Sequence, residues 1–165
     1  AARHFLSKAY SPCGYIGDSS TSPYALHPNE LRFQGYKDAL IRAGSGIDPR
    51  HVRLGMVSVD DARRMAMEIL GQAVRPRAVF TMSDLQAFGV LKAAKQLGLR
   101  VPQDLAIMGF DDIDAADYME LSTVSQSLSE SGRLAAELLL SRIREPDRPL
   151  QNIQLKVAVV ERATT

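Results

Sequence analysis

Short, largely apolar runs alternate along the chain with stretches in which apolar residues recur at helical spacing. The runs cover 13–17, 52–57, 78–82, 104–110 and 154–161, and turn-forming residues bound them, which is typical of strands. The helical stretches cover 29–43, 58–72, 83–98 and 127–145, and residues 1–9 read as the end of a further helix. This alternation predicts an α/β fold in which a parallel sheet carries helices on both faces.

Three of the predicted helices begin at a capping box, in which a serine side chain satisfies the first free N–H groups. These boxes are Ser58–Asp61, Ser83–Gln86 and Ser127–Glu130. The first long helix is expected to turn Leu31, Gly35, Ala39, Leu40 and Ala43 inward. The last one repeats Leu128, Leu134, Ala135, Leu138, Leu139 and Ile143 on one side, and Pro146 ends it.

Composition narrows the classes of function. The chain has 165 residues and a net charge of +1 from 20 basic and 19 acidic groups, so it lacks the basic stripe of a module that binds DNA by its own charge. Cys13 is the single cysteine, which excludes an internal disulfide and a CxxC metal pair. No signal peptide and no apolar run long enough for a membrane span is visible. The opening Ala1-Ala2-Arg3 lacks a helix-start signal, so we expect an excised piece of a longer chain.

Candidate ligand-binding residues follow from the fold. In parallel sheets, ligands bind beyond the carboxyl ends of the strands, which directs attention to loops 18–28, 57–60, 82–85 and 110–118. Asp111 and Asp112 come directly after an apolar strand and could accept hydrogen bonds, hold a metal, or be ordinary turn residues. Arg32, in the first turn of its helix, could grip a hydroxyl, carboxylate or phosphate. Ser83 and Asp84 lie at another strand-to-helix junction, although capping alone would explain Ser83.

No catalytic or cofactor motif emerges. GxSxG, HExxH, Walker and GxGxxG patterns are all missing, and His4, His27 and His51 lack metal-ligand spacing. We therefore predict a protein that is not an enzyme and needs neither a metal nor a cofactor.

Residues 75–113 closely resemble the signature of the lac repressor (LacI/GalR) family. In that signature, a strand ending in a polar pair leads into a helix, as it does here at Ser83-Asp84. A "GLRVP.D" segment follows, as at 98–104, and the next strand ends in "GFDD", as at 109–112. Residues 31–40 match the family's "RLxGFxxAL" helix. Tyr118, Leu121–Val124, Gln126 and the closing strand 157–164 match as well, so the likeness covers nearly the whole chain.

The resemblance implies an effector-sensing module of a DNA-binding transcriptional regulator, with a sugar or a related small polar metabolite as effector. Arg32 and Asp111 would be the principal contacts, and Gln126 would face the pocket from the hinge region. Ser83 stands where the family usually has Asn. Val57 stands where many members place an aromatic ring, a departure that weakens the case for sugar stacking.

The resemblance also implies a division into lobes of the type I periplasmic-binding-protein kind. Residues 1–18 would be a remnant of the N-terminal lobe, 19–126 the C-terminal effector-binding lobe, 127–148 a crossover helix of the N-terminal lobe, and 149–165 the closing strand of the C-terminal lobe. A helix-turn-helix head, through which the regulator would bind operator DNA, would precede residue 1. The protein would be a cytoplasmic homodimer, with no membrane partner.

The dimer interface implied by the family lies on the C-terminal-lobe helices. It would include Leu91, Lys92, Lys95, Tyr118 and Met119.

Three other classes stay open. A periplasmic-type sugar receptor would share the fold and the cleft. A phosphoacceptor receiver domain would need a lysine beyond a late strand, and the late strands offer only Lys156, inside a strand. An enzyme on this scaffold would need a catalytic set that the motifs do not supply.

Overall fold

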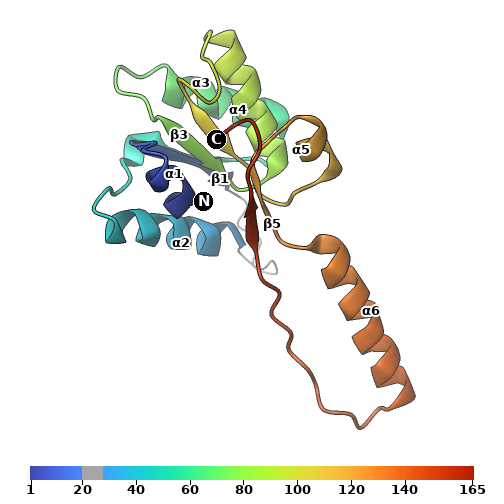
Figure 1. The fold of residues 1–165 in the computed structure, drawn as a ribbon. Coiled ribbons are helices and arrows are strands. Elements are labelled where there is room, and N and C mark those ends of the chain that lie inside the picture. The colour runs from blue at the N-terminus through green and yellow to red at the C-terminus, as the bar shows by residue number, and fades with distance from the viewer. Residues whose placement is uncertain (20–27) are drawn as a thin grey trace.

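A computed structural model describes residues 1–19 and 28–165 of the chain (Figure 1). Its helices are α1 Ala2–Ser7, α2 Pro28–Arg42, the short 3₁₀ helix η1 Pro49–His51, α3 Val59–Leu70, α4 Asp84–Gln96, α5 Asp114–Tyr118 and α6 Leu128–Arg144. Its strands are β1 Cys13–Asp18, β2 Val52–Gly55, β3 Ala78–Thr81, β4 Ala106–Met108, β5 Thr123–Ser125 and β6 Ala158–Val160.

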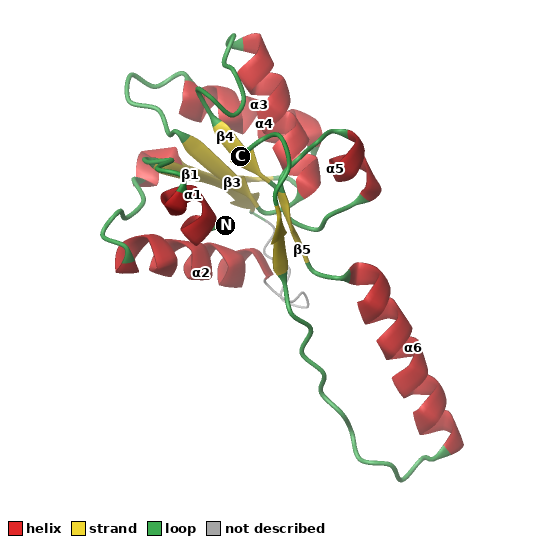
Figure 2. Ribbon diagram, viewed as in Figure 1, coloured by secondary structure: helices red, strands yellow, loops and turns green. Residues whose placement is uncertain are grey.

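Four strands form a parallel sheet in the order β2-β1-β3-β4, and β5 and β6 form a separate antiparallel pair. Successive side chains of a strand point to opposite faces, and the two cores follow that alternation. Tyr15 and Phe80 face α1 and α2, where Leu40 is also fully buried, while Ile16 and Val79 face α3 and α4. The predicted α/β fold with helices on both sheet faces is therefore confirmed (Figure 2).

The two helices on the second face approach each other closely at Gly89. A Cβ atom on this residue would lie 2.4 Å from the carbonyl oxygen of Val59 and 2.7 Å from the Cβ of Ala62. Only glycine fits this crossing of α3 and α4, which therefore pack as one layer against the sheet.

The last quarter of the described chain leaves the body as an arm and then returns. α6 and the extended segment after it project away from the sheet, and α6 has no buried residue (Figure 1). The chain comes back through β6, and Thr164 exchanges hydrogen bonds with Ile107 of β4: the Ile107 N–H donates to the Thr164 carbonyl at 2.8 Å, and the Thr164 hydroxyl donates to the Ile107 carbonyl at 2.7 Å. The C-terminal residues are thus part of the sheet's edge.

Several expectations need correction. Residues 1–18 are not a separate remnant, because β1 pairs with both β2 and β3 at the centre of the sheet and α1 packs on α2. Of the face of α2 expected to point inward, Leu40 is buried, but Leu31 is 79% exposed and Gly35 and Ala43 are exposed too, because the helix buries Tyr36 beside Leu40. Ser127 has a left-handed backbone and its side chain caps nothing, whereas Ser58 and Ser83 cap their helices as predicted.

The bounds of some elements also differ from the pattern. β2 ends at Gly55 and β6 covers only Ala158–Val160, so both strands are shorter than their apolar runs. The short helix α5 lies in a stretch that was expected to be loop.

Candidate functional site

Arg32 reaches from α2 to the carboxyl ends of β3 and β4. Its Nη1 donates a hydrogen bond of 2.8 Å to the carbonyl oxygen of Met82, which follows β3. Its guanidinium carbon lies 3.7 Å from the ring centroid of Phe110, which follows β4. Stacking and hydrogen bonding together hold the cation in place, so Arg32 is pre-oriented at the edge where parallel sheets bind ligands.

Asp111 and Gln126 meet at the same edge. The Gln126 Nε2 donates a hydrogen bond of 2.7 Å to the Asp111 Oδ1, and the Asp111 N–H donates to the Val124 carbonyl at 3.0 Å. Burial raises the pKa of Asp111; the positive charge of Arg32 opposes this rise, and the negative charge of Asp84 adds to it. Burial lowers the pKa of Arg32, with Asp111 opposing. Arg32 and Asp111, both partly buried, therefore interact electrostatically, and each opposes the effect of burial on the other's pKa.

The other predicted contacts lie differently. Ser83 is 6% exposed, and its hydroxyl accepts the Gln86 N–H at 3.3 Å, so the side chain serves the helix start. Val57 is 39% exposed in the loop beyond the edge strand β2. Within the described residues, neither side chain makes a hydrogen bond to Asp111 or Gln126, which are hydrogen-bonded to each other.

Asp112 has a structural partner. Its Oδ1 accepts a hydrogen bond of 2.9 Å from Arg162, which also donates to the Leu121 carbonyl at 2.8 Å. The second carboxylate of the acidic turn thus ties the turn to the returning C-terminal segment, whereas Asp111 accepts the hydrogen bond from Gln126 and interacts electrostatically with Arg32.

The sequence reading missed Asn29. Its side-chain oxygen accepts hydrogen bonds from the Tyr15 hydroxyl at 2.8 Å and from the Asp18 N–H at 3.1 Å, which fixes the amide beside the end of β1. Residues three apart on a helix lie on the same face, so the three-residue spacing between Asn29 and Arg32 could have indicated that both face the same edge of the sheet. His27 lies outside the described residues.

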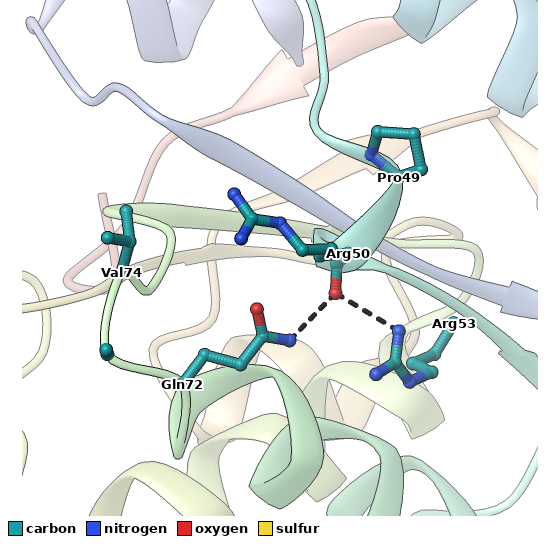
Figure 3. Close-up of a pocket in the computed structure, with 6 residues that line it drawn as sticks. Pro49, Arg50, Arg53, Gln72 and Val74 are labelled. Atoms are coloured by element: carbon teal, nitrogen blue, oxygen red, sulfur yellow. Dashed lines mark hydrogen bonds between the residues drawn. The ribbon is translucent and has the colours of Figure 1, made fainter.

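Two pockets deserve comparison. One of about 260 Å³ lies beside Arg32, and its lining includes Gly35, Tyr36, Phe80 and Phe110. A more open one of about 650 Å³ lies at the other edge of the sheet, before β2 and after α3, where the Arg50 carbonyl accepts hydrogen bonds from Gln72 and Arg53 (Figure 3). There, Arg50 and Arg53 are neutralised by Asp48 and Glu68. Of the two pockets, only the one beside Arg32 lies at the carboxyl edge of the sheet, and neither Asp111 nor Gln126 lines it.

Within residues 1–19 and 28–165, no three His, Cys, Asp or Glu side chains cluster as a metal site would require. Nor does any helix in that part of the chain have the length and apolar character needed to cross a membrane.

Known proteins resemble the chain over nearly its whole length. Residues 2–165 match the family described as periplasmic binding protein-like domain. The ribose operon repressor of Escherichia coli K12 is 34% identical over 166 residues, which are 99% of this chain and 49% of the repressor. The chain belongs to the periplasmic binding protein-like family, in its LacI/GalR branch.

Solved structures of LacI-family proteins have the same fold. A regulatory protein of the LacI family from Chloroflexus aggregans superposes with a TM-score of 0.86 at 28% identity, over 98% of this chain and 57% of that one. The complex of the transcriptional regulator CelR with cellobiose gives a TM-score of 0.87 at 28% identity, over 100% of this chain and 50% of that one. The LacI/GalR chain described here spans about half the length of the curated relatives it matches.

Proposed function

We propose that this chain is the effector-sensing part of a LacI-type transcriptional regulator and that it is not an enzyme. Its effector is a small, hydroxyl-rich metabolite such as a sugar. Operator DNA is contacted by a helix-turn-helix head outside these residues, and the regulator works in the cytoplasm as a homodimer.

The observation that carries the proposal is the hydrogen bond between Gln126 and Asp111 at the same sheet edge as Arg32, whose charge acts on Asp111. A fixed cation, a carboxylate and an amide supply donors and acceptors at one place, which is what several neighbouring hydroxyl groups require. Arg32 and Asp111 are each partly buried, so their hydrogen bonds to a ligand would be stronger than at the open surface.

The relatives support this chemistry. One relative is named for the ribose operon, and one structural neighbour was solved with cellobiose. Both names concern sugars, so D-ribose and cellobiose are the first probes to use with this chain.

The test is an NMR titration of this chain with D-ribose and cellobiose, following the Arg32 Nε–H and Gln126 side-chain amide signals. We expect one of the sugars to shift both signals. Arg32→Ala and Asp111→Ala should each weaken binding by roughly ten- to a hundredfold, because each removes a charged hydrogen bond worth about 1.5–3 kcal/mol.

Arg100→Ala is the matched control. Its guanidinium pairs with Asp104 on the exposed surface, so its loss should leave the titration unchanged. Equal binding by all three variants would show that the contacts were assigned to the wrong residues. No shift with either sugar would contradict the assignment of the effector class.

A further inference from the structure

Asp84 is a buried carboxylate that the proposed effector contacts do not use. It opens α4 directly after β3 and is 0% exposed. Carboxylates are rarely buried to this extent unless hydrogen bonds or charges compensate them, so its partners indicate what it does.

Those partners belong to the turn after β4 and to β5. One carboxylate oxygen, Oδ1, accepts a hydrogen bond of 2.6 Å from the Thr123 hydroxyl, and Oδ2 accepts one of 3.0 Å from the Ile113 N–H. The backbone N–H of Asp84 donates to the Phe110 carbonyl at 2.7 Å. Asp84 therefore holds the turn at both ends and binds the strand that leads to Gln126.

The turn needs such support. Asp111 has a φ of 122° and Asp112 a φ of 61°, in a region that side-chain-bearing residues rarely adopt. Such strain persists only where the surroundings enforce it. Gly109 completes the fit, because a Cβ atom there would lie 2.1 Å from the Asp84 Oδ1.

We propose that Asp84 is the positioning residue of the effector site. Through Ile113 and Thr123 it fixes the turn that carries Asp111 and the strand that leads to Gln126, so that their side chains meet opposite Arg32. The importance of Asp111 as a contact rests on the proposed function, whereas the positioning itself can be measured without any ligand.

The charges around Asp111 make this measurable. Arg32 faces it from α2, Asp84 faces it from α4, and the uncharged Gln126 approaches from the end of β5. The adjacent Asp112 is paired with Arg162. A change at Asp84 therefore alters both the geometry of the turn and the electrostatic field at the Asp111 carboxyl.

The experiment compares Asp84→Asn with the unchanged chain by NMR, in the absence of ligand. We expect the pKa of Asp111 to fall, because a neighbouring negative charge is gone, and the Ile113 amide to exchange about tenfold faster, because its charged acceptor is lost. Asp104→Asn, which removes an acidic partner of Arg100 in another turn, should change neither quantity.

Thr123→Val covers the case in which Asp84→Asn does not fold. It keeps the charge of Asp84 but removes the hydroxyl that donates to Oδ1, so the Ile113 amide should exchange faster while the pKa of Asp111 changes less than in Asp84→Asn.

If a folded Asp84→Asn keeps both the Asp111 pKa and the Ile113 exchange rate, the inference is overturned. Unchanged Ile113 exchange in Thr123→Val overturns it where Asp84→Asn is unfolded. Failure of sugars to bind would contradict the proposed function without touching either result.

Discussion

At the scale of single residues, Arg32 is a charged side chain that its neighbours hold in one orientation. Its guanidinium rests on the Phe110 ring and donates to the Met82 carbonyl, so little of its conformational freedom remains to be lost when a ligand binds. A lysine could neither stack in this way nor donate from a planar fork. Arginine is thus the residue type that this position requires.

The protonation of Asp111 sets a pH dependence. Burial raises its pKa, so the folded chain takes up this proton at a higher pH than an unfolded aspartate, whose pKa is about 3.9. Because protonated Asp111 accepts hydrogen bonds less well, sugar affinity should fall as the pH drops from about 7 towards about 4. Titrations across this range check the expectation, and Asp111→Asn should bind weakly with little pH dependence. Constant affinity down to the lower limit would contradict it.

The raised pKa of Asp111 also affects the stability of the fold, and it does so in the opposite direction: low pH weakens sugar binding but favours folding. Folding raises the pKa of Asp111, so the contribution of this group favours the folded state below the unfolded pKa. That contribution is lost as the pH rises through the folded pKa. The ionised carboxylate of Asp111 therefore does not stabilise the fold at neutral pH.

At the scale of elements, three helices with the same starting pattern begin in different ways. The Ser58 hydroxyl accepts the Asp61 N–H at 3.2 Å, and the Ser83 hydroxyl accepts the Gln86 N–H at 3.3 Å. Ser127 has φ 54° and ψ 50°, a geometry in which its side chain makes no cap. The difference lies in the backbone, which is extended at Ser58 and Ser83 and left-handed at Ser127.

Substitutions at the caps should separate these cases. Ser58→Ala should lower the free energy of unfolding by about 1 kcal/mol, because the partly buried N–H of Asp61 loses its acceptor. Ser127→Ala should change it by no more than about 0.3 kcal/mol, as is usual for exposed positions without a special contact. Urea unfolding followed by circular dichroism measures both. A loss at Ser127 equal to that at Ser58 would indicate that a side-chain cap does form at α6.

At the scale of the whole molecule, the arm is the feature that needs a partner. Leu139, Leu140 and Ile143 of α6 are 62%, 53% and 66% exposed. Leaving such a side chain in water forgoes about 1.5–3 kcal/mol relative to burying it. A continuous apolar helix face of this kind is typical of an association surface.

We therefore predict that this chain self-associates at micromolar concentration. Sedimentation should show a dimer or larger species, and Leu139→Ser combined with Ile143→Ser should shift it towards the monomer. Tyr118→Ser combined with Met119→Ser tests the second predicted surface, whose two side chains are 88% and 49% exposed. A single species of 18.1 kDa from the unchanged chain would contradict both surfaces.

Local patterns were enough to determine the order of the main helices and strands, the α/β class, and two of the three helix caps that were expected. Periodicity and capping depend on residues a few positions apart, which is why they can be read along the chain. The strand-end rule and the family resemblance also singled out Arg32, Asp111 and Gln126; the structure shows a hydrogen bond between the last two and an electrostatic interaction of Asp111 with Arg32, and their role as effector contacts stays a prediction.

Only the tertiary structure decided what depends on distant residues. β1 became an inner strand by pairing with β2 and β3. Leu31 became exposed because α2 buries Tyr36, which had not been expected, together with Leu40. The Asp112 carboxylate accepts a hydrogen bond from Arg162, fifty positions away. The Asp84 carboxylate accepts hydrogen bonds from Thr123 and Ile113. Sequence spacing cannot show these partners, because a carboxylate that ends up buried and one that ends up in water look the same until the chain has folded around them.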